Sequence, residues 1–214
     1  MKANNKAVRA KEREIKYTHL EMGSQVACFM FSGAGYTYEK PLLYYATMVL
    51  LQHNIDVVQI HYSYEEGLLK RDFAYIAGKI MDDVNPVVLD VLENRQYAEM
   101  IFLGKSLGTI PVVHEFMKNA AYVKAKMILL TPLLKFEAIY NTILHSKHQG
   151  LLVIGDQDPH YNSEQIEHLK QSNLEIEVIP NANHSLDIEH FAAVQSIASL
   201  SRVIGKLQET ITDI

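Results

Sequence analysis

The sequence predicts an α/β protein with one mostly parallel sheet of about seven strands and helices on both faces of that sheet. Two observations support this. Short apolar runs alternate with longer amphipathic segments, which is the order that builds a parallel sheet flanked by helices. Most runs also lack the alternation of apolar and polar residues typical of a sheet with one wet face, so they suit strands covered on both sides. The runs are Gln25–Phe31, Asp56–His61, Met100–Leu103, Met127–Leu130, Leu151–Ile154 and Ile176–Ile179.

The remaining segments predict one further strand and a set of helices. A weak alternation at Glu12–His19 indicates an antiparallel strand at the edge of the sheet. The segment Glu65–Arg95 is long enough for two helices, and Pro86 marks the expected break because proline lacks the amide hydrogen that a helix interior needs. The other expected helices are Pro41–Gln52, Ser106–Asn119, Leu134–Ser146, Ser163–Gln171 and Asp187–Glu209.

Length and composition favour one domain. The chain has 214 residues, of which 48% are hydrophobic, and no repeat or Pro/Gly-rich linker divides it. We therefore expect a single domain over residues 1–214, in which residues 1–20 form a polar segment containing the edge strand. Only about twenty residues separate the run that ends at Leu130 from the run that begins at Leu151, which leaves room for one crossover helix and no cap domain.

The charge balance argues against several kinds of partner. The formal net charge is −5 at pH 7, whereas nucleic acids and anionic membranes attract proteins with an excess of Lys and Arg. We expect neither partner. The N-terminal segment is polar and basic without the apolar stretch of a secretory signal, and no window reaches the roughly 18 apolar residues of a membrane span. The one cysteine, Cys28, lies in an apolar run and reads as a core residue, so a cytoplasmic protein is expected.

A serine follows the third of these apolar runs. Gly104-Lys105-Ser106-Leu107-Gly108 comes directly after Met100–Leu103, and an apolar-periodic helix follows. This is the G-x-S-x-G pattern in the strand–turn–helix setting that exposes a nucleophilic serine on a strained turn. Gly104 and Gly108 relieve the crowding on either side of Ser106. The start of the helix also directs free N–H groups toward the serine.

Two other interpretations of this segment are weaker. Gly104-Lys105-Ser106 is also the tail of the phosphate-binding loop G-x-x-x-x-G-K-[ST], which requires a glycine where this chain has Glu99. The residues between would form a flexible cradle in that loop, whereas Met100–Leu103 are strand-like, so the nucleotide interpretation fails. A chance pentapeptide in a loop is the remaining alternative, and the strand–turn–helix setting argues against it.

A serine nucleophile needs a base to take its proton, and the base needs a third group that fixes its tautomer. His184 follows the run Ile176–Ile179 and precedes the last expected helix, a position that distinguishes it among the ten histidines. Two aspartates compete on the loop after Leu151–Ile154. Asp156 lies nearer the strand end, as turn-forming aspartates often do, whereas the backbone of Asp158 is restrained by the proline that follows it.

Metal binding has weak support in the sequence. His145 and His148 form an i, i+3 pair near a helix end, but no acidic or cysteine cluster would complete a ligand set. We expect no metal and no other cofactor.

Acyl transfer also requires fixed hydrogen-bond donors that stabilise the negative charge developing on the carbonyl oxygen. One donor is expected to be the backbone N–H of Leu107, the residue after the nucleophile. The second is expected from the loop Ser32–Tyr36, where we favour the N–H of Ala34 with Gly35 and Tyr36 as alternatives. The same loop does not complete the dinucleotide fingerprint G-x-G-x-x-G, because position 38 is not glycine.

With these motifs in this order, the chain resembles the α/β-hydrolase superfamily, and within it the small lidless esterase or dienelactone-hydrolase-like branch. The resemblance covers roughly residues 25–205. It implies that Ser106, Asp158 and His184 form a catalytic triad, and the family pattern favours Asp158 over Asp156. The four motifs that carry it are Ser32-Gly33-Ala34-Gly35, Gly104–Gly108, Gly155-x-x-Asp158 and Asn183-His184-Ser185.

Two positions depart from the family pattern. Ser32 stands where the oxyanion loop often has histidine. Lys105 is unusual beside the nucleophile, where it either favours an anionic substrate or points into solvent. Dienelactone hydrolases use cysteine as the nucleophile, so Ser106 argues against that particular activity.

These inferences predict a cytoplasmic serine hydrolase that cleaves a small soluble carboxylic ester or thioester through an acyl-enzyme intermediate. The expected substrate-binding residues of its open cleft are Gly35, Tyr36, Lys105 and Tyr62. A binding or regulatory protein on the same fold is the alternative from another class, and a peptidase or acyltransferase is the alternative among enzymes. The sequence leaves the oligomeric state open, and a homodimer is compatible with it.

Overall fold

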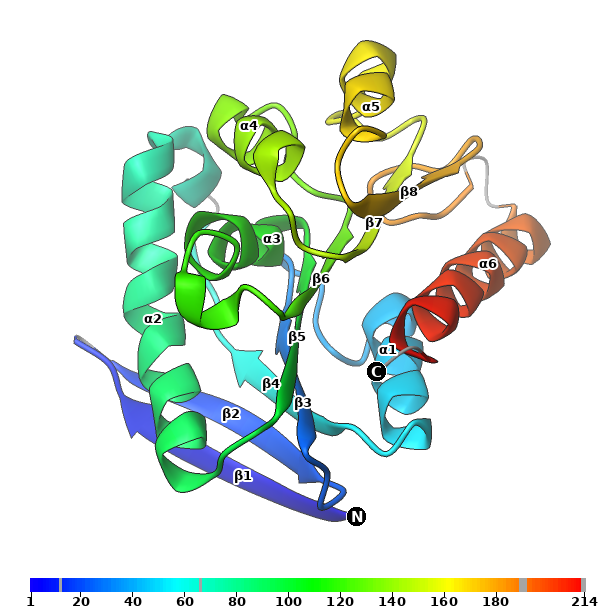
Figure 1. Ribbon diagram of the computed structural model, residues 1–214. Coiled ribbons are helices and arrows are strands. Elements are labelled where there is room, and N and C mark those ends of the chain that lie inside the picture. The colour runs from blue at the N-terminus through cyan, green and yellow to red at the C-terminus, as the bar shows by residue number, and fades with distance from the viewer. Residues whose placement is uncertain (12, 66, 189–191, 213–214) are drawn as a thin grey trace.

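The structure is a computed structural model that describes residues 1–11, 13–65, 67–188 and 192–212. Its centre is an eight-stranded sheet with the strand order β1-β2-β4-β3-β5-β6-β7-β8 (Figure 1). The pairs β1–β2 and β2–β4 are antiparallel and the other pairs are parallel, so the predicted α/β fold with a mostly parallel sheet is confirmed. The strands are β1 Lys2–Arg9, β2 Glu14–Glu21, β3 Val26–Phe31, β4 Asp56–His61, β5 Glu99–Lys105, β6 Lys126–Leu130, β7 Gly150–Gly155 and β8 Leu174–Ile179.

The N-terminal strands correct one prediction. A strand does form at Glu14–Glu21, but it is second from the edge, because Lys2–Arg9 pairs with it along its whole length and forms the edge itself. The sequence KANNKAVR of β1 is mostly polar and mostly exposed, so it carries no apolar pattern that marks a strand. Glu12, the first residue of the predicted strand, lies outside the described residues.

Helices cover both faces of the sheet (Figure 1). One hydrophobic cluster joins the sheet to α2, α4 and α5, and a second cluster joins the opposite face to α1 and α6. The helices are α1 Pro41–Gln52, α2 Phe73–Asn94, α3 Thr109–Pro111, α4 Glu137–His145, α5 Ser163–Leu169 and α6 Ala193–Thr212, with short turns η1 Leu68–Lys70, η2 Ser106–Gly108, η3 Val112–Phe116 and η4 Ala120–Tyr122.

The predicted break at Pro86 is wrong. The helix α2 continues from Phe73 to Asn94 with Pro86 inside it. Proline in a helix interior costs about 3 kcal/mol. The neighbouring residues Val84, Val87 and Val88 are buried in the core, and each buried valine contributes about 1.5–3 kcal/mol, so packing outweighs the proline penalty.

The helix after β5 is also less regular than predicted. Instead of one helix over 106–119, the chain forms the 3₁₀ turn η2, the short α3 and the π-helical turn η3. Pro111 has no amide hydrogen for the carbonyl of Leu107, which removes one α-helical hydrogen bond at this point. The last helix begins at Ala193 rather than Asp187, and part of the predicted segment, residues 189–191, lies outside the described residues.

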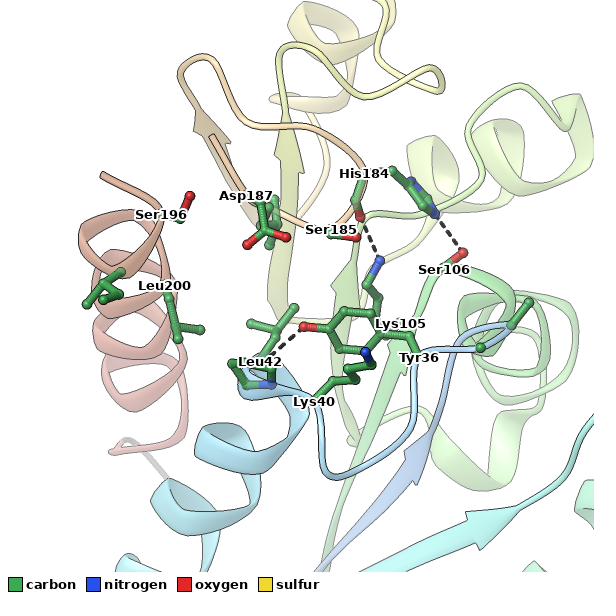
Figure 2. Close-up of a pocket in the computed structure, with 15 residues that line it drawn as sticks. Tyr36, Lys40, Leu42, Lys105, Ser106, His184, Ser185, Asp187, Ser196 and Leu200 are labelled. Carbon is green, nitrogen blue, oxygen red and sulfur yellow. Dashed lines mark hydrogen bonds between the residues drawn. The ribbon is translucent and has the colours of Figure 1, made fainter. Parts of the chain in front are cut away.

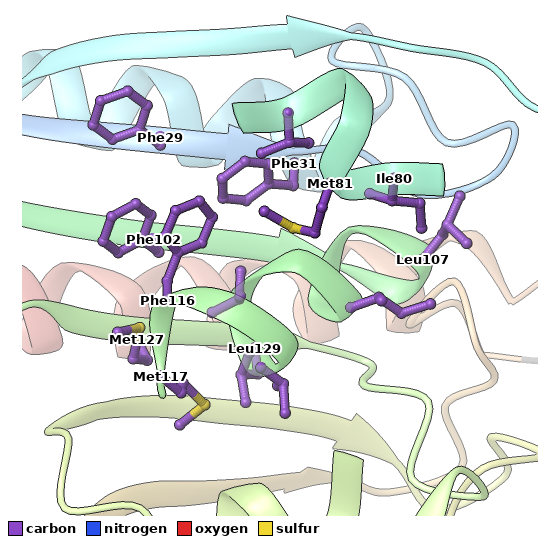
Figure 3. Close-up of a cluster of buried hydrophobic side chains, with 14 of the residues drawn as sticks. Phe29, Phe31, Ile80, Met81, Phe102, Leu107, Phe116, Met117, Met127 and Leu129 are labelled. Atoms are coloured by element: carbon purple, nitrogen blue, oxygen red, sulfur yellow. The ribbon is translucent and has the colours of Figure 1, made fainter. Parts of the chain in front are cut away.

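An aromatic stack packs against β3 and β5 on the face of the sheet that α2 covers (Figure 3). The ring centroids of Phe102 and Phe116 are 4.1 Å apart, and Phe29 and Phe31 stack against the same pair. Leu107 is buried in the same cluster. The strands β3 and β5 and the turn after β5 are therefore held by one continuous core.

The crossover between β6 and β7 is short, as predicted. Residues 131–149 are all described, and they hold the single helix α4 and no inserted cap domain. Within the described part of the chain, no helix has both the length and the apolar character needed to cross a membrane.

Candidate active site

Ser106 is the first residue of η2, the tight turn that directly follows β5. Its backbone φ is 54°, a left-handed conformation that is unfavourable for a residue with a side chain. A Cβ built on Gly104 would lie 2.3 Å from the carbonyl oxygen of Gly108, and one built on Gly108 would lie 2.0 Å from that of Phe31. Gly104 therefore lets the turn fold back closely on the end of β5, and Gly108 lets the same turn pack against the end of β3.

The structure brings the three predicted residues together, although they lie after three different strands, and Figure 2 shows the contact between Ser106 and His184. His184 Nε2 is 2.7 Å from Ser106 Oγ, and His184 Nδ1 is 2.7 Å from Asp158 Oδ2. A Cβ built on Gly155 would lie 2.0 Å from the carbonyl oxygen of Ala182, so a glycine at the end of β7 lets the loop with Asp158 approach the loop with His184.

The carboxyl group of Asp158 is placed to remain ionised. Burial raises its pKa, but hydrogen bonds from the His184 ring and from the backbone N–H of His160 outweigh this effect, so the pKa lies below its ordinary value. An ionised acceptor at Nδ1 favours the tautomer in which that nitrogen carries the proton. His184 Nε2 is then free to accept the hydroxyl proton of Ser106.

Asp156, the competing aspartate, has a different role. Its Oδ1 accepts hydrogen bonds from the backbone N–H of Asn181 at 2.7 Å and from the Gln157 side chain at 3.0 Å. Asp156 therefore ties the turn after β7 to the turn after β8. Of the two aspartates, Asp158 is the one that contacts His184.

The loop after β3, which was expected to supply an oxyanion donor, lies against Ser106. A Cβ built on Gly33 would lie 3.3 Å from the Cβ of Ser106. The N–H of Tyr36 donates to the carbonyl of Gly33 at 3.3 Å, so it is engaged, which leaves the N–H groups of Ala34 and Gly35 as candidates for the second donor. The N–H of Leu107 lies in the first turn of η2, where backbone donors lack intrahelical acceptors.

A cavity of about 420 Å³ opens beside Ser106 and His184 (Figure 2). Its volume is within the usual range of small-molecule sites, about 300–1,000 Å³. One wall is apolar and comes from α1 and α6, a contribution that the sequence analysis missed because no local pattern shows which helix faces a distant loop. The residues that line the cavity are Ala34, Gly35, Tyr36, Lys40, Pro41, Leu42, Lys105, Ser106, His184, Ser185, Leu186, Asp187, Ser196, Ile197 and Leu200.

Lys105 lies inside the protein, so the expectation that it points into solvent is wrong. The residue is 1% exposed, and its Nζ donates to Thr131 Oγ1 and to the backbone carbonyl of His184, both at 2.7 Å. The same Nζ lies 4.9 Å from the ring centroid of Tyr36. Burial lowers the pKa of Lys105 to about 8, although the nearby carboxylate of Asp158 opposes the shift.

The other predicted binding residues divide into two groups. Gly35 and Tyr36 line the cavity that contains Ser106. Tyr62 does not, because its hydroxyl donates to the carbonyl of Ser32 at 2.8 Å and its ring lines a separate hollow with His61. The position of Tyr62 after β4 suggested proximity to the serine, but the hydrogen bond to Ser32 holds its side chain elsewhere.

Three residues at the site have potential metal ligands. Asp158, His160 and His184 offer atoms that all lie within 4.8 Å of one another. Since Asp158 and His184 already share a hydrogen bond, an ion at this position would have to displace it. The sequence analysis did not single out His160, whose ring centroid is 5.5 Å from that of His184.

Comparison with known proteins identifies the family. A family profile described as an alpha/beta hydrolase domain matches residues 25–212. The chain belongs to the alpha/beta hydrolase family. This confirms the superfamily that the four sequence motifs indicated. A search of curated protein sequences finds no significant match.

Solved structures of the same fold include the dienelactone hydrolase from Anabaena variabilis, with a TM-score of 0.70 and 18% identity over 99% of this chain and 97% of that one. An esterase from Pyrococcus furiosus has a TM-score of 0.70 and 12% identity over 98% and 93% of the two chains. A serine hydrolase without a lid from Xanthomonas campestris has a TM-score of 0.69 and 16% identity over 99% and 94%. These relatives agree with the lidless branch that the motifs indicated.

Proposed function

We propose that this chain is a serine hydrolase that cleaves small carboxylic esters or thioesters through an acyl-enzyme intermediate. The observation that carries the proposal is the continuous hydrogen-bonded chain from Ser106 Oγ through the His184 ring to Asp158 Oδ2, with both contacts at 2.7 Å. The names of the structural relatives, an esterase and a dienelactone hydrolase, support the same class of reaction.

In the first half-reaction, Ser106 Oγ attacks the carbonyl carbon of the substrate while His184 Nε2 takes the hydroxyl proton. Asp158 stabilises the imidazolium that forms. The N–H groups of Leu107 and Ala34 donate to the oxyanion of the tetrahedral intermediate. When that intermediate collapses, His184 gives its proton to the leaving alcohol or thiol, and the acyl group remains on Ser106.

In the second half-reaction, a water molecule takes the place of the leaving group. His184 Nε2 removes a proton from this water as it attacks the acyl carbon, and a second tetrahedral intermediate forms. Its collapse returns the proton to Ser106 Oγ and releases a carboxylic acid. The cycle needs no change in oxidation state.

The cavity indicates the size and polarity of the substrate. A volume of about 420 Å³ and the absence of a cap between β6 and β7 suit a small ester that approaches from solvent. Leu42 of α1 and Leu200 of α6 belong to the apolar wall, and the buried side chain of Leu186, from the loop that contains His184, adds to the apolar lining. We therefore propose that one arm of the ester is apolar.

Reaction with a fluorophosphonate probe tests the proposal, because such probes label serines that a neighbouring base activates. The wild-type protein is expected to be labelled and to hydrolyse short p-nitrophenyl esters. Ser106→Ala should abolish labelling, and His184→Ala should lower kcat by about 10⁴-fold. Ser201→Ala is the matched control, since this serine is exposed on α6 and is not among the residues that line the cavity.

The opposite result is equally clear. If the folded wild-type protein is neither labelled nor active on short esters, the hydrolase proposal is wrong, and a binding or regulatory role takes its place.

A further inference from the structure

The segment 183–187, which we name the histidine loop, is ordered mainly by its own first residue. Asn183 Oδ1 accepts hydrogen bonds from the backbone N–H groups of Ser185 at 2.8 Å and Asp187 at 3.2 Å. The N–H of Asn183 donates to the carbonyl of Asp187, and the N–H of Leu186 donates to the carbonyl of Asn183. These bonds shape the histidine loop, but they do not tie it to the sheet.

Within the described part of the chain, every hydrogen bond between the histidine loop and the rest of the protein involves His184. Its ring contacts Ser106 and Asp158, and its backbone carbonyl accepts from Lys105 Nζ at 2.7 Å. The two ring contacts change during the proposed reaction, because the ring gains and loses a proton and Ser106 Oγ stops donating once it is acylated. The contact from Lys105 depends on neither event.

Lys105 is held at both ends. Its backbone immediately precedes Ser106 at the end of β5, and its Nζ is fixed by Thr131 Oγ1 at 2.7 Å and by the face of Tyr36. With His184 as a further partner, the ammonium group is surrounded by protein groups and is poorly placed to bind an anionic substrate. One buried side chain thus connects the nucleophile's own strand to the backbone of the base.

We propose that Lys105 is a positioning residue that keeps His184 in register with Ser106 through both half-reactions. Its contribution is largest in the acyl-enzyme, when the hydrogen bond between Ser106 and His184 is absent and the base must still direct a water molecule. The kinetic consequences of this assignment rest on the proposed function. Its structural consequence, that Lys105 orders the histidine loop, does not.

The kinetic test compares Lys105→Met and Lys105→Ala with wild type on a short p-nitrophenyl ester. Loss of the contact lets the base move, and a displacement of about 1 Å costs about 100-fold, so we expect kcat to fall about 10- to 100-fold with KM changed by less than about threefold. Propylammonium should restore part of kcat in Lys105→Ala, whereas tetramethylammonium, which has no N–H donor, should not.

The matched control is Lys126→Met. Lys126 Nζ also donates to a backbone carbonyl at 2.7 Å, that of Thr210, but it lies at the start of β6, the opposite end of the sheet from the site. This variant should keep the kcat of wild type. An equal loss of kcat in Lys126→Met and Lys105→Met would overturn the proposal, as would rescue by tetramethylammonium.

A second readout does not require turnover. Amide hydrogen exchange over residues 183–187 should be faster in Lys105→Met than in wild type or Lys126→Met, because the histidine loop loses a link to the sheet. If exchange and kcat are both unchanged in Lys105→Met, the assignment of Lys105 is overturned and the proposed function stands. If the wild-type protein is not labelled by the fluorophosphonate, the proposed function fails, and the exchange measurement still decides whether Lys105 orders the loop.

Discussion

Gly108 is where we expect one added carbon to affect both activity and stability. In Gly108→Ala the new Cβ would lie 2.0 Å from the carbonyl oxygen of Phe31 and 2.8 Å from that of Ser32. Cβ atoms in real structures essentially never approach another heavy atom closer than 3.0 Å, so the two backbones must separate by about 1 Å. Neither contact involves a flexible side chain that could move aside.

Both backbones in this contact carry groups of the candidate active site. The turn η2 contains Ser106 and Leu107, and β3 leads into the loop with Ala34. Moving one against the other by about 1 Å separates Ser106 and Leu107 from Ala34, the second proposed oxyanion donor, and a misplacement of this size costs about 100-fold in rate. Overpacking of this kind also destabilises a protein by about 1–3 kcal/mol.

The assay pairs kcat/KM on p-nitrophenyl acetate with urea unfolding followed by circular dichroism. Gly78→Ala and Gly205→Ala are the controls, since a Cβ built at either position in α2 or α6 meets nothing within 4 Å. Each control should raise the free energy of unfolding by about 0.5–1 kcal/mol and leave kcat/KM unchanged. A Gly108→Ala variant with wild-type kcat/KM and wild-type stability would refute the steric reasoning.

Three further predictions follow from individual contacts. Asp158→Asn should lower kcat about 10⁴-fold because the amide favours the wrong tautomer of the base, whereas Asp156→Asn should retain most activity; steady-state kinetics would show the reverse if the assignment is wrong. Burial lowers the pKa of Lys105 to about 8 in the folded state, so at this residue the unfolded chain binds more protons between pH 8 and its own pKa, and the contribution of Lys105 to the free energy of unfolding should rise with pH across that window. Burial raises the pKa of Cys28 and of several tyrosines, which has the opposite effect on stability, so urea unfolding at several pH values should be compared between wild type and Lys105→Met. The free energy of wild type minus that of the variant should increase across the window, and a difference that stays constant would contradict the cause. Pro86→Ala restores a helical N–H in α2 and should raise the free energy of unfolding by about 1–3 kcal/mol. If urea unfolding gives a lower free energy for the variant than for wild type, the proline is locally favourable.

The sequence predicted best those features that depend on residues close to one another along the chain. Six apolar runs correspond to β3 to β8, and for most of these strands the reason is that a strand covered on both faces must be largely apolar. The glycines around Ser106 were readable for the same reason, since their requirement comes from atoms within a few residues and from the adjoining strand. The choice between Asp156 and Asp158 came from the family resemblance, and the structure supplies its physical reason in the contact with His184.

Features that depend on distant packing were not readable. The polar strand β1 forms because β2 offers it a complete edge, and α2 passes through Pro86 because the valines beside it are buried. Tyr62 was expected in the cleft and lies outside it, and Lys105 was expected either to face an anionic substrate or to point into solvent and is buried instead. Which way each side chain turns is set by a partner far along the chain, the Ser32 carbonyl for Tyr62 and the His184 carbonyl for Lys105.

The stability of Lys105→Met separates a structural role from a positioning role. A buried ammonium is unfavourable unless its hydrogen bonds are complete, and an apolar side chain of similar volume is often as stable or more stable. Replacing Lys105 removes that desolvation penalty and leaves two acceptors without their donor, so the two effects oppose each other. We expect the free energy of unfolding at pH 7 to change by less than about 2 kcal/mol while kcat falls at least tenfold. A variant that loses stability and activity in parallel would indicate that Lys105 supports the fold, whereas loss of activity in an equally stable protein would indicate that the charge is retained to hold the base.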